Sequence, residues 1–166
     1  LGPEGIAVFY CREHMRDALK LHQLGWHMAD NPWNFADENP RPSSSAKRFE
    51  AGSPNTLGQV AMHASLDLLL DIGMTSIAER VLANTRWLVN QVDLMPELEL
   101  TRSPEPERWS GIVCIRHRKL DQHRLHKHLS EAGITTALRG GSVRISPHFY
   151  QDRDDLGQLI EVLKKL

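Results

Sequence analysis

The stretch 134–146 has the sequence ITTALRGGSVRIS, and it decides how the C-terminal half of the chain folds. Apolar and polar residues alternate after the two glycines, as they do in a strand with one buried face. The Arg139-Gly140-Gly141 segment is typical of a tight hairpin turn. The stretch therefore predicts two short antiparallel strands, over residues 134–138 and 142–146.

Strand and helix patterns flank this hairpin on both sides. Residues 98–100 and 111–115 read as strands, and residues 121–132 read as a helix that ends before Gly133. Residues 152–165 form an amphipathic helix. The order strand, strand, helix, strand, strand, helix predicts a small α+β sandwich, with helices on one face of a mainly antiparallel sheet.

The N-terminal half has a different pattern. Gly5–Cys11 reads as a buried strand, residues 12–24 as a helix, and residues 25–48 as a long loop rich in Pro, Asn, Ser and Trp. The fold class is therefore α/β, and we expect two domains, over residues 1–74 and 75–166.

Two consecutive helices are expected to join these domains. The first would begin with Ser53 as its N-cap and Pro54 in the first turn, and would run to about Ile72. Because this helix is apolar around most of its surface, we expect it to be buried. The second would span about residues 75–92 and is amphipathic.

Composition excludes several classes of protein. The chain has 166 residues, is 40% hydrophobic and 25% charged, and has a formal net charge of -1. No basic surface for nucleic acid is expected, and the apolar stretches are shorter than a membrane span. Leu1–Gly5 lacks the pattern of a signal peptide, and Cys11 and Cys114 are expected to be reduced and buried. We therefore expect a cytoplasmic protein without a nucleic-acid or membrane partner.

One candidate site lies in the sequence RFEAGSPN, residues 48–55. Gly52 and the hydroxyl residue Ser53 precede a helix, whose free N–H groups and dipole favour an anion such as phosphate. The alternative is that Ser53 only caps its own helix.

A second candidate site is the sequence SVRISPHFY, residues 142–150. Val143 and Ile145 face one side of the predicted strand, so Arg144 faces the other. A guanidinium held on a strand suits bidentate binding of a carboxylate. The alternative is a surface arginine on a solvated face.

The histidines offer a weaker candidate for a metal site, formed by His117, His123, His126 and His128. Two of them, His123 and His126, share a helix face, but no carboxylate or cysteine completes a ligand set. We therefore expect a solvated helix face and no metal.

In their sequences and in their order along the chain, three segments together resemble the class V aminotransferase family. This family includes cysteine desulfurases, kynureninases and isopenicillin N epimerase-like proteins. The segment from Gly2 to Tyr10 looks like the strand that follows the family's Schiff-base lysine. Residues 48–55 look like its Arg-Phe-Glu and Gly-Thr-Pro-Asn segment, and residues 144–150 look like its C-terminal Arg-x-Ser-x-x-x-Tyr segment.

The resemblance implies a homodimeric enzyme that uses pyridoxal 5'-phosphate and acts on an amino acid. Residues 1–74 would be the end of the large cofactor domain, and residues 75–166 the small C-terminal domain. Gly52 and Ser53 would contact the cofactor phosphate across the dimer, with Ser in place of the usual Thr. Arg144 would hold the substrate α-carboxylate. Gln151-Asp152 replaces the family's Asn-Thr after the tyrosine.

Three functional residues of the family lie upstream of the position that corresponds to Leu1. They are the Schiff-base lysine, the aspartate at the pyridine nitrogen and the residue that stacks on the cofactor ring. The chain also has no initiator Met. We therefore expect a processed or trimmed C-terminal portion, without catalytic residues of its own and inactive alone.

The subtype of reaction can be narrowed by the segment between Ile134 and Arg144. Cysteine desulfurases carry a nucleophilic cysteine in this region, and a persulfide needs a thiolate within reach. The segment has no cysteine. A transaminase, an epimerase or a lyase is therefore expected. The alternatives are a non-catalytic α+β binding or regulatory module over residues 98–166, or a cysteine desulfurase-like protein.

Overall fold

The computed structural model describes residues 2–101, 103 and 105–166. Leu1, which begins the segment compared above with a signal peptide, lies outside the described residues. The chain forms two compact units, Leu1–Leu68 and Leu69–Leu166. The domain boundary expected between residues 74 and 75 stays a prediction.

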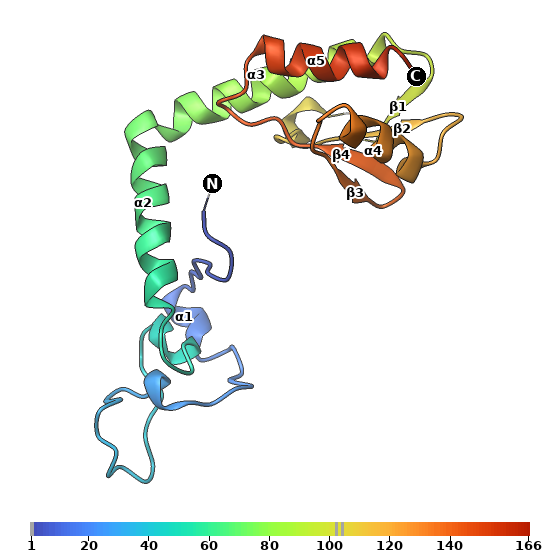
Figure 1. The fold of residues 1–166 in the computed structure, drawn as a ribbon. Coiled ribbons are helices and arrows are strands. Elements are labelled where there is room, and N and C mark those ends of the chain that lie inside the picture. The colour runs from blue at the N-terminus through green and yellow to red at the C-terminus, as the bar shows by residue number, and fades with distance from the viewer. Residues whose placement is uncertain (1, 102, 104) are drawn as a thin grey trace. The chain divides into compact units, whose positions relative to one another are not determined.

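The C-terminal unit is built on a four-stranded antiparallel sheet (Figure 1). Its strands are β1 (Leu98–Leu100), β2 (Val113–His117), β3 (Ala137–Arg139) and β4 (Ser142–Ile145), in the order β1-β2-β4-β3. All four predicted strands are confirmed, with ends that differ by up to three residues.

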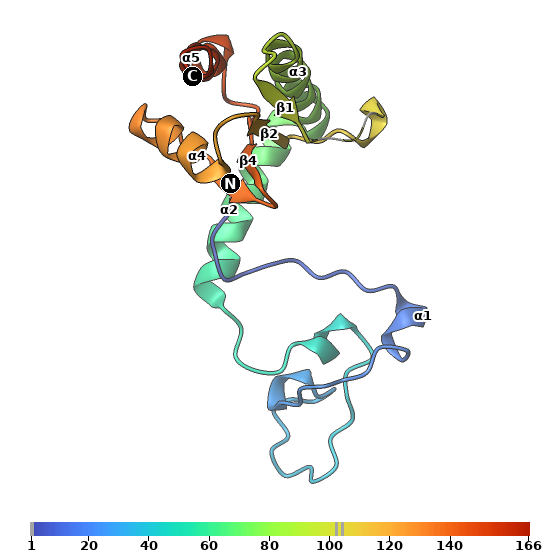
Figure 2. The same cartoon turned by 90° about the vertical axis from the view of Figure 1, so that its right-hand side faces the viewer.

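Three helices cover one face of this sheet (Figure 2). They are α3 (Met74–Asp93), α4 (Gln122–Glu131) and α5 (Arg153–Leu163). One core joins them to the strands, and it consists of Leu88, Val89, Val92, Leu98, Val113, Ile115, Leu125, Leu129, Val143, Ile145, Leu159, Ile160 and Leu163. The predicted sandwich, with helices on one face of an antiparallel sheet, is therefore confirmed.

A two-residue turn joins β3 to β4. Gly140 has φ +52° and Gly141 has φ +81°. Positive φ at both central residues matches the twist of an antiparallel hairpin, and glycine adopts it without strain. The turn fixes the register in which Leu138 pairs with Val143 and Ala137 pairs with Arg144.

The N-terminal unit has little regular structure apart from α2 (Thr56–Ile72), which begins in it. It contains the short helix α1 (Glu13–Arg16) and the 3-10 turns η1 (Trp26–Met28) and η2 (Ala46–Phe49). The predicted helix over residues 12–24 is therefore wrong beyond its first turn. No residue of α1 is buried, and a short helix without packing is marginal in water.

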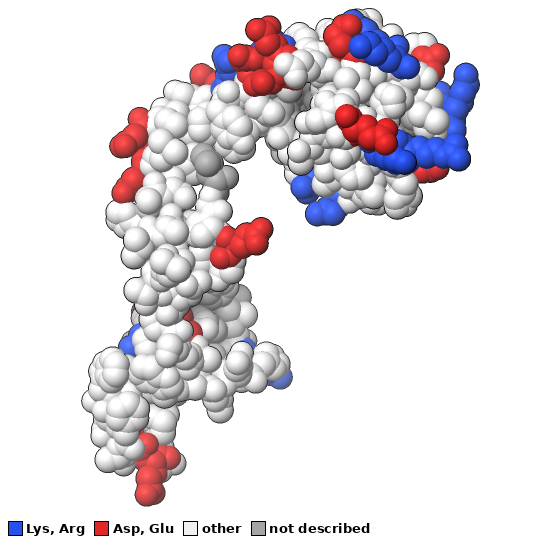
Figure 3. Space-filling view, viewed as in Figure 1, with Lys and Arg blue, Asp and Glu red and all other residues white. Residues whose placement is uncertain are grey.

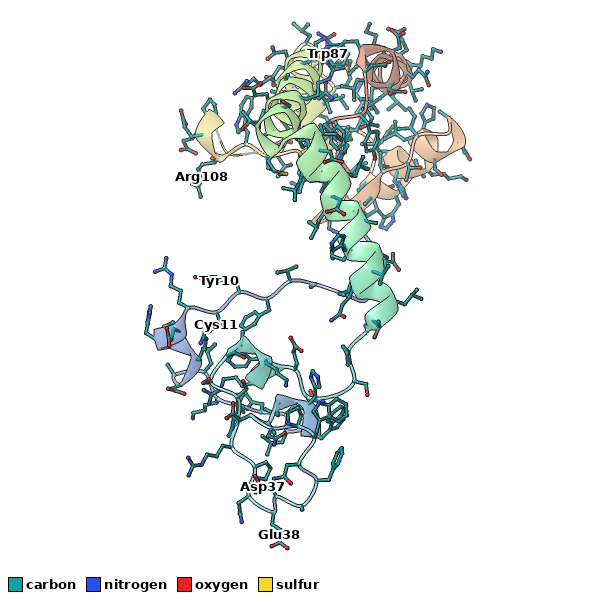
Figure 4. The ribbon with its side chains drawn as sticks, turned by 90° about the vertical axis from the view of Figure 1, so that its left-hand side faces the viewer. Tyr10, Cys11, Asp37, Glu38, Trp87 and Arg108 are labelled. Carbon is teal, nitrogen blue, oxygen red and sulfur yellow. The ribbon has the colours of Figure 1, made fainter. Side chains whose placement is uncertain are left out.

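The predicted buried strand at Gly5–Cys11 is also wrong. Residues 6–12 are assigned to no strand, and none of the described residues pairs with them in a ladder. Val8 is 78% exposed and Tyr10 is 80% exposed, whereas the adjacent Cys11 is buried (Figure 4). Apolar composition favours a strand, but a strand also needs a neighbour for its backbone hydrogen bonds.

Asn55 caps α2, and Ser53 does not. The Asn55 side-chain oxygen accepts a hydrogen bond from the Gly58 N–H at 2.9 Å, and the helix begins at Thr56. A side chain at position 58 would collide with the Asn55 amide, since its Cβ would lie 2.5 Å from Nδ2. The predicted start at Ser53 and Pro54 is therefore wrong by two residues.

The prediction that α2 is buried over most of its girth is wrong for this chain. Gly58 is the one buried residue of the helix, and Leu57 is 82% exposed. On the face drawn in Figure 3, the surface of α2 is largely uncharged, with acidic residues along one edge. The cap at Asn55 and the glycine at its end, rather than packing, define where the helix begins and ends. Gly73, with φ +90°, separates it from α3.

No single helix among the described residues is long and apolar enough to cross a membrane, although α2 and α3 taken together pass that test by length and composition.

The cap of α2 gives a direct test of which residue starts the helix. We expect Asn55→Ala to lower the free energy of unfolding by about 0.5–2 kcal/mol, because the Gly58 N–H loses its acceptor. Ser53→Ala should change it by less than about 0.5 kcal/mol. Denaturant unfolding followed by helical circular dichroism measures both, and the reverse ranking would return the cap to Ser53.

Candidate functional site

The segment from Glu50 to Asn55 lines a cavity of about 540 Å³ in the N-terminal unit. A second wall is the extended segment Ile6–Val8. The third wall is one face of α2, formed by the i, i+3, i+4 and i+7 positions Gln59, Met62, His63 and Leu66. Gly52 and Ser53, the residues expected to bind an anion, both line this cavity.

The long loop of residues 25–48 holds this segment in place. Gly25 packs so closely on Ala51 that a Cβ at position 25 would lie 1.9 Å from the Ala51 carbonyl oxygen. The His27 N–H donates to the same oxygen at 3.4 Å. On the other side, the Asn55 amide donates to the carbonyl oxygen of Gly5 at 3.3 Å. The segment from Glu50 to Asn55 is thus held by contacts with the loop before it and with the extended segment near the N-terminus.

Gly52 and Ser53 are open to solvent at the edge of this cavity. Both residues are exposed, and no described atom lies within 4 Å of where a Cβ of Gly52 would be. Because Asn55 caps the helix, the Ser53 hydroxyl is free of that role, and it has no hydrogen-bond partner among the described residues. A phosphate accepts hydrogen bonds from a hydroxyl and from backbone N–H groups, which are the donor types that this segment carries.

Arg144 occupies the centre of the other candidate site. It lies on β4 between Cys114 of β2 and Ala137 of β3, which are its cross-strand partners. Its neighbours Val143 and Ile145 are buried in the core, so the Arg144 side chain projects from the opposite face of the sheet. We call this the outer face, defined by Cys114, Arg116, Ala137, Arg139, Ser142 and Arg144. The predicted orientation of Arg144 is confirmed.

The Arg144 side chain is half-buried and unsatisfied. Its Nε atom is buried and has no hydrogen-bond partner among the described residues. A buried guanidinium N–H without an acceptor is costly and calls for an explanation. The Nε atoms of Arg16 and Arg48 are unpaired in the same way among the described residues. Because Arg144 is half-buried, it is not a fully solvated surface arginine, and its Nε–H is available to an acceptor such as a carboxylate.

A buried amide fixes the backbone that follows Arg144. Asn84 of α3 is 2% exposed and donates from Nδ2 to the carbonyl oxygens of His148 and Gln151, both at 3.0 Å. The Gln151 side chain in turn accepts from the His148 N–H at 2.8 Å. The His148 ring stacks on Tyr150 at 4.7 Å, and burial lowers the pKa of His148. The exit of β4 is thus attached to α3, which holds Arg144 in register.

Two of the four candidate histidines make local contacts, whereas His123 and His128 are exposed. His117 Nδ1 accepts from the N–H groups of Lys119 and Leu120, and His126 Nδ1 lies 2.9 Å from the Thr136 hydroxyl. Among the described residues, no group of three His, Cys, Asp or Glu could hold a metal ion. Cys11 is buried and Cys114 is half-buried, and both are free thiols.

Two features of the site were missed in the sequence. Asn55 is as good a cap as serine, so the residue type before Thr56 already indicated it. Asn84 gave no such signal, because a polar residue in an amphipathic helix is normally solvated. Gly52 and Ser53 lie in the N-terminal unit and Arg144 lies in the C-terminal unit, so they are two separate candidate sites.

Comparison with known proteins matches most of the chain, including both candidate sites, to one family. Residues 1–159 match the family model Aminotransferase class-V. A probable cysteine desulfurase of Halobacterium salinarum is 26% identical over 176 residues, covering 96% of this chain and 41% of that protein. An uncharacterized aminotransferase of Bacillus subtilis is 27% identical over 161 residues, covering 97% of this chain and 41% of that protein. The chain thus spans less than half the length of these relatives.

Solved structures give the same fold. The apo structure of a cysteine desulfurase from Thermococcus onnurineus matches with a TM-score of 0.85 at 21% identity, covering 99% of this chain and 43% of that chain. A cystine C-S lyase in complex with its product cysteine persulfide matches with a TM-score of 0.79 at 17% identity, covering 93% and 40%. With the family match over residues 1–159, the chain belongs to the class V aminotransferase family.

Proposed function

We propose that the complete protein is a pyridoxal-phosphate enzyme that acts on an amino acid, as a transaminase, an epimerase or a lyase. The observation that carries this proposal is Arg144 on the outer face of the sheet, whose buried Nε has no partner among the described residues. This chain supplies two binding elements, one for the cofactor phosphate and one for the substrate.

The cofactor element is the Gly52-Ser53 segment. The backbone of Gly52 and the hydroxyl of Ser53 would hold the phosphate of the cofactor in the neighbouring subunit of a homodimer. When bound, pyridoxal phosphate withdraws electrons from the substrate's α-carbon, and the protein contributes orientation and charge. The open space at Gly52 and the unpartnered Ser53 hydroxyl support this assignment.

The substrate element is Arg144. Its planar guanidinium would bind the α-carboxylate through two parallel hydrogen bonds, which fixes the orientation of the α-carbon. The core on one side of β4 and the Asn84 bonds at its exit hold the arginine in place. Its task is therefore capture and orientation, not proton transfer.

The lysine that binds the cofactor would lie outside this chain. None of the residues that line the cavity beside Gly52 and Ser53 is a lysine. We therefore propose that the residues described here do not turn over substrate alone, and that the complete protein works in the cytoplasm.

Two other functions are less well supported. A free-standing α+β module over residues 98–166 has no reason to carry residues 1–55, which the family match includes. Cysteine desulfurases are among the relatives, but the β3–β4 turn is only Gly140-Gly141 and has no cysteine. Cys114 is the cross-strand partner of Arg144, so it lies on a paired strand and not in the β3–β4 turn.

Removing the Ser53 hydroxyl tests the phosphate site. In the full-length protein, Ser53→Ala should weaken pyridoxal phosphate binding by about 0.5–1.5 kcal/mol, the net contribution of one hydrogen bond. Binding of pyridoxal, which has no phosphate, should not change. Equal binding of the phosphorylated cofactor by the variant and the parent would remove Ser53 from the site.

Replacing Arg144 tests the carboxylate site. Arg144→Lys keeps the charge but loses the planar fork, so it should not behave as a conservative change. We expect Arg144→Lys and Arg144→Ala to lower kcat/KM for the amino-acid substrate. The loss should correspond to about 2–5 kcal/mol of transition-state stabilisation.

Cofactor absorbance at saturation should be normal in both variants, because the phosphate site is in a different unit. Exposed Arg124 on α4 offers a matched control, as Arg124→Lys. Normal kcat/KM with Arg144 removed would show that another residue holds the carboxylate.

A further inference from the structure

The outer face of the sheet carries two arginines besides Arg144. Arg116 lies on β2, two residues beyond Cys114, and Arg139 lies at the end of β3. The alternation along β2 places Arg116 on the side opposite buried Ile115 and His117. Arg139 pairs with Ser142, so it shares that face. Three guanidiniums therefore project from one surface.

Arg116 is fixed against the β3–β4 turn. Its Nε donates to the Ser142 hydroxyl and its Nη2 donates to the Gly140 carbonyl oxygen, both at 2.9 Å. Ser142 is 2% exposed. A Cβ on Gly141 would lie 3.3 Å from Nη2, so the glycine leaves room for the guanidinium. Two of the five guanidinium N–H groups are thus used, and three remain for a ligand.

Among the described residues, none of these three arginines is held in a salt bridge, although Glu99 of β1 lies on the same face directly opposite Arg116. The Arg116 side chain is bonded instead to the turn on the other side. A solvated arginine needs no such anchoring, whereas a preorganised one loses little entropy when it binds.

Arg116 is close enough to Arg144 to share a ligand with it. Arg144 pairs with Cys114, so Arg116 is its diagonal neighbour on β2. Diagonal residues on one face lie about 7–8 Å apart, within reach of two long side chains. A dicarboxylic amino acid has its two carboxylates separated by two or three carbons, so two arginines whose side chains leave neighbouring strands on one face can each bind one of them.

We propose that Arg116 binds a second carboxylate of the substrate, so that the enzyme takes dicarboxylic amino acids. This inference rests on the proposed role of Arg144 at the α-carboxylate. Arg116 would recognise the distal carboxylate through a bidentate pair, and it would set specificity without taking part in the reaction.

Binding of two unreactive acids to the cofactor-loaded full-length protein tests this role. Glutarate has two carboxylates and butyrate has one, and calorimetry gives a dissociation constant for each. The parent should bind glutarate more tightly than butyrate. Arg116→Gln should weaken glutarate binding by about tenfold to a hundredfold, the contribution of hydrogen bonds to a charged group, and leave butyrate unchanged. Arg124→Gln, on exposed α4, should change neither.

The same titrations separate this proposal from the proposed function. Loss of binding of both acids in Arg144→Gln, with glutarate unaffected by Arg116→Gln, would overturn the role of Arg116 and keep that of Arg144. Unchanged binding of both acids in Arg144→Gln would overturn the carboxylate role of Arg144 itself. Arg116→Lys keeps the charge and tests the fold: if both Arg116 variants weaken butyrate as strongly as glutarate, the residue is structural and the proposal fails.

Discussion

The alternation of β4 is the constraint on which the proposed substrate-binding arginine depends. Val143 and Ile145 are buried in the core, so Arg144 has to project from the outer face. A register shift of one residue would bury the guanidinium and expose two apolar side chains. The positive φ values of Gly140 and Gly141 exclude that shift, because they fix the turn that sets the pairing with β3. The position of the arginine is thus a consequence of hydrophobic burial and turn geometry together.

The segment proposed to bind the cofactor phosphate is held in a different way. Gly52 and Ser53 are exposed, and close backbone contacts hold the segment that carries them, with Gly25 against Ala51 and the Asn55 amide on Gly5. Because Asn55 provides the helix cap, Ser53 keeps its hydroxyl for another partner. The proposed phosphate site would combine the backbone N–H groups at the N-terminus of α2 with the separate Ser53 hydroxyl. Neither would lose a structural hydrogen bond when the anion binds.

The sequence predicted the C-terminal unit better than the N-terminal unit, for a physical reason. Residues 98–163 contain both the strands and the helices that bury one another, so their periodicity reports contacts that the chain makes itself. Gly5–Cys11 and α2 are apolar, yet in this chain Val8 and Leu57 are exposed. Apolar composition records that a segment favours burial, but it does not identify the surface that covers it. The same limit applies to the site: the orientation of Arg144 followed from alternation, whereas the Asn84 contact and the anchoring of Arg116 depend on residues far apart in the sequence.

The position of a bound substrate carboxylate tests the central claim most directly. The measurement is an experimental structure of the cofactor-loaded full-length protein, with an amino-acid analogue that binds but does not react. The account predicts that the α-carboxylate accepts hydrogen bonds from the Arg144 guanidinium, with the Ser53 hydroxyl on a cofactor phosphate. An α-carboxylate held by any other residue, with Arg144 facing solvent, would contradict it.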